Sequence, residues 1–374
     1  MTDSGLLILG ADLFTTFAIY LVITLGLNLE NGYAGIPNFG KVLAVAGGAF
    51  VAGFFPGRLM AYLMGFDTGI GYINDNDRIV TLITRALEND LLLSIALFTA
   101  TLIVAAAVGA ILGLIASYPA IRLREDYLAM TLLAMGEGMR IIGQNYYPLV
   151  GGSRSVSVPN PFAYFGDSRY SMIMFGFLVI ALLAMAYLER LIRSPLGRVL
   201  RAMRDDEVAA SSLGKDAVRL RMKVLAVGSA LGAIGGALYV FYTCNCSAAA
   251  YNRFDWTFWP WVAMMLGGAA NNIGVALGVL VFVATRQGIT LFKGQIAPYV
   301  PFDPVWLEPL LFGSALILIL MFRPDGILPE KPTHTITPTQ VKVRPKDLKA
   351  IMKRITELPV SIFNKLKRAL LRHS

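Results

Sequence analysis

The chain has little charge and almost no histidine or cysteine. Only 15% of its 374 residues are Asp, Glu, Lys or Arg, and it contains two histidines and two cysteines. A soluble domain is about one quarter charged, so this composition excludes an ordinary soluble protein. Two cysteines and two histidines leave no room for a disulfide framework or a multi-ligand metal site, and we expect no metal. We interpret Cys244 and Cys246 as unpaired thiols near a helix end.

The sequence also lacks the residue patterns of catalysis. Both histidines, His334 and His373, lie near the C-terminus, and no Ser-His-Asp, Cys-His or paired-carboxylate arrangement is visible. We therefore expect that the chain is not an enzyme. The net charge of +9 does not require a nucleic-acid partner, because basic residues of a membrane protein gather in its cytoplasmic loops.

Long apolar segments are what the sequence has instead. Hydrophobic residues make up 56% of the chain, and its mean hydropathy is +0.62. A membrane helix needs about 20 apolar residues, so the pattern predicts an all-α polytopic bundle with about eight or nine spans. The fourth span, which contains Glu137 and Arg140, and the short, glycine-rich seventh are the weakest. The expected spans are roughly 6–29, 40–63, 91–117, 126–143, 170–190, 222–243, 257–270, 273–292 and 305–322.

The distribution of Lys and Arg predicts the orientation of these spans. Segment 190–223 has the densest basic charge between spans, which marks it as cytoplasmic. Alternating nine spans then puts the N-terminus and the acidic segment 65–90 outside and the C-terminus inside. The N-terminus lacks the basic start and cleavage site of a signal peptide, so we expect its apolar segment to stay as a helix. The predicted location is the cell (inner or plasma) membrane.

The chain divides into two predicted parts. Residues 1–330 form the transmembrane domain, and residues 331–374 form a basic cytoplasmic tail. The tail begins with a proline-rich linker and continues with Leu, Ile and Phe among many Lys and Arg. Two interpretations stay open for it: a basic amphipathic helix on the inner membrane surface, or a disordered positive tail.

Three polar clusters interrupt the apolar spans. Glu137 and Arg140 are spaced i, i+3, close enough to pair on one helix face. The other two clusters are Asn28, Glu30, Asn31, Asn38 and Lys41, and Asn271 with Asn272. Polar groups in spans are costly, so each cluster is either a tight inter-helix contact or the lining of a translocation path made by broken helices. Glycine pairs at 47–48, 235–236 and 267–268 predict close helix packing.

The stretch Gly35–Val42 matches most of a phosphate-binding loop, G-x-x-x-x-G-K. Its last position is Val42, which has no hydroxyl for Mg²⁺, and the match lies between two membrane spans rather than after a β-strand. We therefore expect no ATP site and no cofactor in this chain. Lys41 stands at the edge of a span, and we expect it to extend to the inner surface, with a substrate contact as the alternative.

Several stretches together resemble one family. Residues 26–50 contain G-L-N-L followed by G-Y-x-G and N-x-G, and residues 123–142, LREDYLAMTLLAMGEGMRII, contain D-Y-x-A-x-x-T-L with a later Glu and Arg. With the closing stretch FRPDGIL, they resemble the permease subunits of ABC importers for branched-chain amino acids, of the LivM type. The chain departs from the family pattern at Lys41, where His or Gln is usual, and at Ala270, where Gly is usual.

Residues 194–216 resemble the cytoplasmic loop that such permeases press into their ATPase partner. The pattern E-x-A-A-x-x-x-G is met by Glu207, Ala209, Ala210 and Gly214. A short helix with the small residues 209–211 on one face suits a shallow cleft, and Gly214 suits its left-handed end. The resemblance implies that nearby arginines pair with acidic groups of the partner: Arg198, Arg201 and Arg204.

The resemblance also implies a mechanism. An extracytoplasmic solute-binding protein delivers the solute, a second homologous permease completes the path, and two ATP-binding cassette subunits bind ATP and Mg and drive transport. The solute is expected to be a branched-chain or other amino acid, with urea or short-chain amides as the alternative; a secondary transporter or channel is the alternative of another class. The candidate path residues are Asn28, Tyr33, Asn38, Lys41, Asn271 and Asn272.

Overall fold

A computed structural model describes residues 3–123, 125–299, 303–323 and 325–330 of the chain. These residues form an all-helical fold, as predicted, apart from one antiparallel pair of two-residue strands, β1 Val156–Ser157 and β2 Asn245–Cys246. The predicted tail, 331–374, lies outside the described residues, so its amphipathic character and the domain boundary at residue 330 stay predictions.

Six helices in the described part of the chain are long and apolar enough to cross a membrane. They coincide with the first, second, third, fifth, sixth and eighth predicted spans, since continuous apolar sequence of that length forms a helix in lipid. They are α1 Asp3–Leu27, which runs on into a π-helical segment, α2 Lys41–Leu63, α5 Leu91–Arg122, α8 Arg169–Arg193, α11 Ala217–Thr243 and α13 Asn272–Ile296.

The other three predicted spans are shorter or more polar helices. α14 Leu307–Phe322 is apolar but has 16 residues, which gives about 24 Å against a hydrocarbon core of about 30 Å. α6 Glu125–Asn145 has 21 residues and carries the Glu137 and Arg140 charges. α12 Trp259–Gly267 has nine residues and follows a π-helical segment, η5 Phe254–Phe258. The predicted total of eight or nine spans is therefore not confirmed.

Glycines let the central helices touch backbone to backbone. α11 packs against α5, α2 and α1. A Cβ placed on Gly48 of α2 would lie 1.9 Å from the Ala233 carbonyl oxygen of α11, and one on Gly236 would lie 2.0 Å from the Val45 oxygen. No side chain fits at those distances, so the packing role predicted for these glycines is confirmed.

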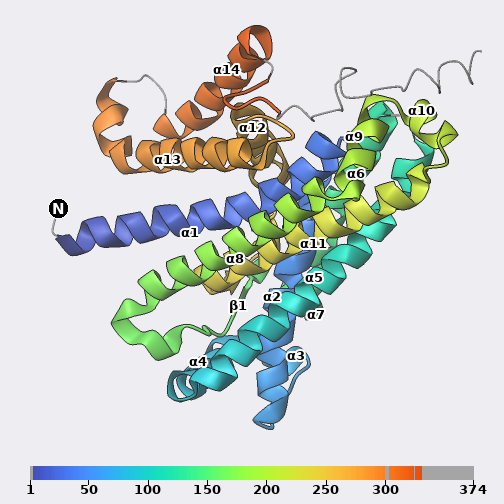
Figure 1. Cartoon of the computed structure of the whole chain (residues 1–374). Coiled ribbons are helices and arrows are strands. Elements are labelled where there is room, and N and C mark those ends of the chain that lie inside the picture. The colour runs from blue at the N-terminus through green and yellow to red at the C-terminus, as the bar shows by residue number, and fades with distance from the viewer. Residues whose placement is uncertain (1–2, 124, 300–302, 324, 331–374) are drawn as a thin grey trace, which may run out of the picture. The chain divides into compact units, whose positions relative to one another are not determined.

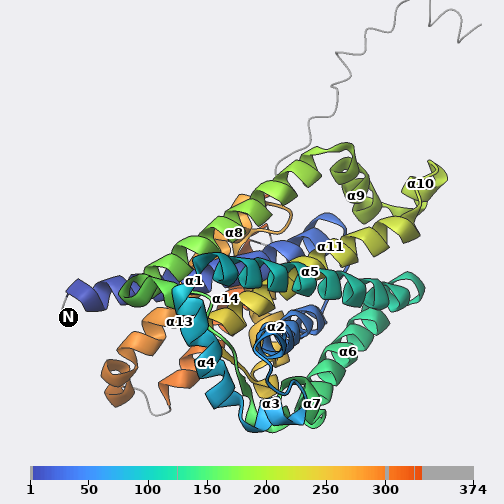
Figure 2. The same ribbon diagram turned by 90° about the horizontal axis from the view of Figure 1, so that it is seen from below.

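The two ends of the bundle carry different small elements. α9 Pro195–Asp205 and α10 Glu207–Ser212 lie at one end, and α4 lies toward the other, with the N-terminal end of α1 (Figures 1 and 2). A second apolar cluster joins α3 and α4 to the end of α2. Segments predicted to face opposite sides of a membrane thus lie at opposite ends. The remaining elements are α3 Ile70–Asn74, α4 Asn76–Asn89, α7 Tyr147–Val150, η2 Gly152–Arg154, η3 Ala163–Ser168, η4 Ala248–Ala250, η6 Ala297–Tyr299 and η7 Pro304–Trp306.

Candidate functional site

Two helix breaks meet inside the bundle. After Leu27 the first helix widens into the π-helical segment η1 Asn28–Tyr33, a geometry common at functional sites. Asn28 lies at this break, where its Nδ2 donates to Asn272 Oδ1 at 3.0 Å and its Oδ1 accepts from the Ala270 N–H at 2.9 Å. The polar cluster that contains Asn28 and the cluster of Asn271 and Asn272 are therefore brought into direct contact.

The second break lies between α12 and α13. Asn271 caps α13, with its Oδ1 accepting from the N–H groups of Ile273 and Gly274, both at 3.2 Å. Just before it, Ala270 has φ +59, in the left-handed region that favours glycine. This is the position at which the sequence departs from the family's usual glycine, so the departure places strain in the connection.

Lys41 is buried in an ion pair. Its Nζ lies 3.0 Å from Glu30 Oε1 and donates to the Gly228 carbonyl oxygen at 2.7 Å, and both charged side chains are fully buried. Asn38 Nδ2 donates to the other Glu30 oxygen at 2.9 Å. The expectation that Lys41 extends to the inner surface is wrong. The lysine turns inward because glycines on facing helices leave room: a Cβ on Gly26 would lie 3.0 Å from its Nζ.

The Glu137–Arg140 pair is local to α6. Arg140 Nε donates to Glu137 Oε1 at 2.9 Å, and both side chains are partly exposed. Within the described part of the chain, this pair makes no hydrogen bond to the asparagines of the two helix breaks. The structure thus places one of the three polar clusters apart from the other two.

The loop 194–216 forms two short helices with their own caps. Ser194 caps α9 and Asp206 caps α10, its side chain accepting from the Ala209 N–H at 2.9 Å. Gly214 follows α10 with φ +76, which confirms its predicted left-handed conformation. Glu207 Oε2 accepts from Arg221 at 2.6 Å, so the glutamate of the sequence pattern is held within the chain.

The exposed surface of this loop differs from the predicted small-residue face. Ala210 is buried, 4% exposed, whereas Ala209 is exposed. The large apolar side chains of Val208 and Leu213 are 77% and 79% exposed. Three residues of a helical turn cannot all face one way, so Ala210 packs inward and the apolar tip consists of Val208 and Leu213.

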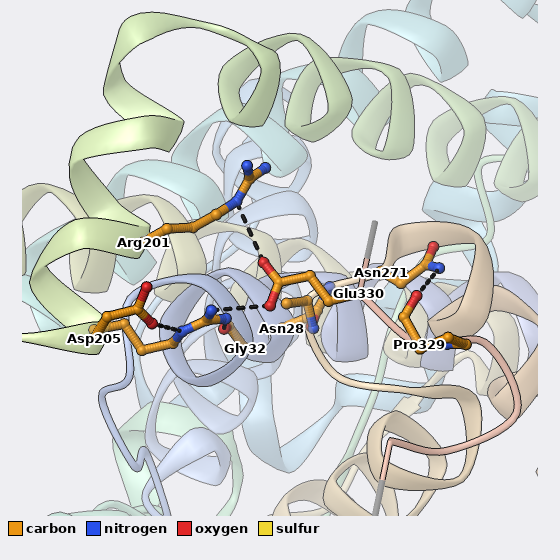
Figure 3. Close-up of polar contacts among 9 residues, drawn as sticks. Asn28, Gly32, Arg201, Asp205, Asn271, Pro329 and Glu330 are labelled. Atoms are coloured by element: carbon orange, nitrogen blue, oxygen red, sulfur yellow. Dashed lines mark hydrogen bonds and ion pairs between the residues drawn. The ribbon is translucent and has the colours of Figure 1, made fainter. Parts of the chain in front are cut away.

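Arg201 and Arg204 are engaged within the chain. Arg204 Nη1 donates to the Gly32 carbonyl oxygen at 2.7 Å, and its Nη2 donates to Glu330 Oε2 at 2.9 Å, while Arg201 Nε lies 3.4 Å from the other Glu330 oxygen (Figure 3). In the structure both arginines already face a carboxylate of this chain, and their pairing with acidic groups of a partner stays a prediction. Arg198 is exposed, and its pairing with an acidic group of the partner also stays a prediction.

Glu330 and Asp205 stabilise the charged form of Arg204. Burial by itself lowers the pKa of the guanidinium, but the hydrogen bond and charge of Glu330, with Asp205, outweigh it and raise the pKa above its usual value. Arg204 therefore stays charged at any physiological pH. Its side chain also packs on Gly35, which has φ +70.

The last described residues complete the site. The N–H groups of Ile327 and Leu328 donate to the carbonyl oxygens of Leu266 and Gly267, both at 3.0 Å. Asn271 Nδ2 donates to the Pro329 oxygen at 3.0 Å (Figure 3). Segment 327–330 thus holds Glu330 beside α9. We call the whole set the inner polar network; its members are Asn28, Gly32, Arg201, Arg204, Asn271, Asn272, Pro329 and Glu330.

The network and its neighbours bury nearly all the predicted path residues. Asn28, Lys41 and Asn272 are at most 2% exposed, and Tyr33 and Asn38 are 3% exposed. Each asparagine has hydrogen-bond partners, and the Arg201 guanidinium lies over the Tyr33 ring. Sequence reasoning did not identify Glu330 as a site residue, because nothing near it in the sequence indicates that it pairs with Arg201 and Arg204. Mechanically, the arrangement joins an exposed loop to a break inside a membrane helix.

The comparisons agree with this architecture. Residues 10–320 match the family described as branched-chain amino acid transport system / permease component. The chain is 40% identical over 329 residues, 87% of its length and 94% of the relative's, to the probable branched-chain amino acid transport permease protein LivM of Methanocaldococcus jannaschii. No solved structure matches the chain.

Two kinds of permease from one organism are among the relatives. The chain is 24% identical over 343 residues, 85% of its length and 69% of the relative's, to the high-affinity branched-chain amino acid transport system permease protein LivM of Escherichia coli. It is 27% identical over 327 residues, 84% of its length and 92% of the relative's, to LivH of the same system name and organism. The match spans most of the chain and confirms the resemblance: this chain belongs to the LivM-like branched-chain amino acid transport permeases, which are multi-pass membrane transport components and not enzymes.

Proposed function

We propose that the chain is one of two permease subunits of an ABC importer that moves branched-chain amino acids into the cell. The observation that carries the proposal is the direct link from α9 to the broken first helix, made by the Arg204 hydrogen bond to Gly32. An exposed loop joined in this way to the membrane interior is what a partner that changes shape needs in order to act on the path.

The partners follow from this assignment. Two ATP-binding cassette subunits, carrying ATP and Mg, dock on the apolar tip of Val208 and Leu213, and Arg198 is free for an acidic group of the docked subunit. The E. coli relatives LivM and LivH are two different permeases, which supports pairing with a second, homologous permease. A solute-binding protein delivers the amino acid at the opposite end. This places α9 and α10 in the cytoplasm and the N-terminus outside.

The inner polar network, in this proposal, is the closed inner end of the path. Its asparagines, with Tyr33, Asn38 and Lys41, are buried and hydrogen-bonded in this conformation. Unwound helix segments offer N–H and C=O groups to a polar solute once they separate. Movement of α9 acts on Gly32 through Arg204 and thereby on Asn28, four residues earlier in the same π-helical segment.

The test uses the exposed apolar tip rather than Glu207, because Glu207 is paired with Arg221 inside the chain. Leu213→Asp puts a charge on the tip without touching an internal contact, and Leu82→Asp, on an exposed position of α4 at the other end, is the matched control. We expect Leu213→Asp to abolish co-purification of the ATPase and leucine uptake, while the control keeps both. Retention of both by Leu213→Asp would refute the docking assignment.

The reconstituted complex also distinguishes the proposed importer from two alternative functions. A secondary transporter or channel keeps leucine flux when ATP is withheld from the reconstituted complex, whereas the importer stops. A urea or amide importer takes up those solutes in place of leucine, which direct competition between the labelled solutes reveals.

A further inference from the structure

A cavity with a mainly apolar lining and several polar groups lies between four segments, away from the inner polar network. Its volume is about 370 Å³, and it is walled by α1, the last turns of α11, η5 and α13. This is within the usual range for a small-molecule site, about 300–1,000 Å³. In the proposed orientation it lies toward the outer side, because the N-terminal part of α1 and the last turns of α11 and α13 contribute its walls. The residues used below are Asp12, Thr16, Tyr20, Tyr239, Trp256 and Arg286.

One arginine on α13 faces the cavity among acceptors. Arg286 Nη1 donates to the Tyr20 hydroxyl at 2.7 Å, Nη2 donates to Asp255 at 3.2 Å, and Nε lies 3.1 Å from Glu308. A guanidinium has five N–H donors, so these contacts leave two for an incoming acceptor. Asp255 and Glu308 already balance the charge of Arg286, so the guanidinium offers N–H donors rather than uncompensated charge. An arginine within a membrane helix is costly and marks a functional position, and its planar fork suits a carboxylate.

A carboxylate on α1 faces the same cavity without a cation. Asp12 accepts hydrogen bonds from the Tyr242 hydroxyl and from Gln287 Nε2. Among the described residues, no Lys, Arg or His side chain forms an ion pair with it. Both donors are neutral, so they leave the negative charge of Asp12 uncompensated, and an ammonium group is the ligand that such a charge attracts.

Aromatic rings form an apolar wall of the same cavity. Tyr20 stacks on Trp256 with ring centroids 5.7 Å apart, and Tyr239 meets Trp256 edge-on at 4.7 Å. Val283 of α13 adds an aliphatic contact. This surface suits a branched aliphatic side chain.

We propose that this cavity is a binding site for a zwitterionic amino acid with a compact apolar side chain. Asp12 receives the ammonium, Arg286 receives the carboxylate, and Tyr20, Tyr239 and Trp256 receive the side chain. The assignment rests on the proposed function and deepens it, since it gives the transported solute a place in this chain apart from the inner polar network.

The experiment measures protection of a cysteine placed in the cavity wall. Thr16→Cys lies on α1 between Asp12 and Tyr20, and Thr81→Cys, on an exposed position of α4, is the matched control. The complete importer is reconstituted in nanodiscs and modified with a small charged thiol reagent. The parent chain, in which Cys246 is buried and Cys244 is partly exposed, gives the background.

Leucine is expected to protect the cavity cysteine alone. At twice its Kd it slows modification of Thr16→Cys about threefold, because the unliganded fraction of the protein equals 1/(1 + [L]/Kd). It leaves the modification rate of Thr81→Cys unchanged. Isoamylamine has only the ammonium and 4-methylpentanoate only the carboxylate. Each loses one charged contact, so each needs at least about tenfold more ligand for equal protection.

A conservative variant tests the ammonium contact. Asp12→Asn removes the charge and keeps one oxygen, which accepts from either Tyr242 or Gln287, whereas the aspartate accepts from the two donors with separate oxygens. About tenfold more leucine is then needed to protect Thr16→Cys. Unchanged protection in Asp12→Asn, or equal protection by isoamylamine and leucine, overturns the assignment. Absence of protection in an importer that still takes up leucine overturns the cavity and leaves the proposed function standing. Absence of leucine uptake by the unaltered importer is instead the failure of the proposed function.

Discussion

Replacing Lys41 with methionine is expected to destabilise the protein strongly. The change removes the cation that lies 3.0 Å from Glu30 Oε1 and the donor to the Gly228 oxygen at 2.7 Å. Methionine fills similar space, so the effect is electrostatic. Asn38 remains as a donor to the Glu30 carboxylate, but it is neutral and does not replace the lost positive charge.

The magnitude follows from the burial of both groups. Breaking one side of a buried ion pair costs about 3–5 kcal/mol, because it leaves an uncompensated buried charge, whereas replacing both partners with neutral groups is often nearly neutral. We therefore expect about 4 kcal/mol for Lys41→Met, and only about 1–2 kcal/mol for Glu30→Gln combined with Lys41→Met. Lys41→Gln, which installs a residue usual in the family, is expected to lie between them.

The assay is thermal unfolding of the purified permease in detergent, followed by tryptophan fluorescence, with the yield of membrane-inserted protein as a second reading. The double variant is expected to unfold at a higher temperature than Lys41→Met. Lys223→Met, near the N-terminal end of α11, serves as the matched control and is expected to have little effect, since Lys223 is exposed. The reasoning is refuted if Lys41→Met unfolds like the parent, or if the effects of the two substitutions simply add.

Three further outcomes are expected. Ala270→Gly relieves the positive φ of +59 and raises the free energy of unfolding by about 1 kcal/mol, while Ala269→Gly, which lacks a positive φ, does not; thermal unfolding measures both. Gly48→Ala puts a Cβ 1.9 Å from the Ala233 oxygen and is expected to lower the free energy of unfolding by about 1–3 kcal/mol or more. Its control is Gly138→Ala on α6, where a Cβ has no atom within 4 Å, and this change raises stability slightly. A Gly48→Ala variant as stable as the parent contradicts the described packing. Arg204→Gln breaks the link from α9 to Gly32 and Glu330, so it lowers leucine uptake while the ATPase still co-purifies. Arg198→Gln, at an exposed position, keeps these internal contacts and weakens co-purification of the ATPase.

The sequence predicted the long helices because each depends on a continuous apolar run, which is a local property of the chain. Six apolar runs of membrane length became six helices, and Gly214 ends α10 in the left-handed conformation that its position after a short capped helix implies. The other three predicted spans are not confirmed, for an equally local reason. α12 has nine residues and α14 has 16, so hydropathy could not decide whether either crosses the membrane alone.

The candidate site depends on contacts between distant segments, which the sequence does not display. Asn28 and Asn272 are separated by 244 positions, and Arg204 and Glu330 by 126. The sequence showed that Asn271 and Asn272 are polar residues between apolar helices, but their partners come from the other side of the fold. For the same reason Lys41 was expected to extend to the inner surface of the membrane: the space it fills inside the bundle is made by Gly26 on α1 and Gly232 on α11.

Polar residues in membrane helices are therefore of two physical kinds in this chain. Glu30 and Lys41 satisfy each other away from any surface, so in this conformation they fix how η1, α2 and α11 meet. Asp12 and Arg286 line an open cavity with charge or donors left over, so they have something to offer a solute. Burying a polar group is costly in both cases, but the unused hydrogen-bonding capacity, and not polarity alone, distinguishes a binding residue from a structural one.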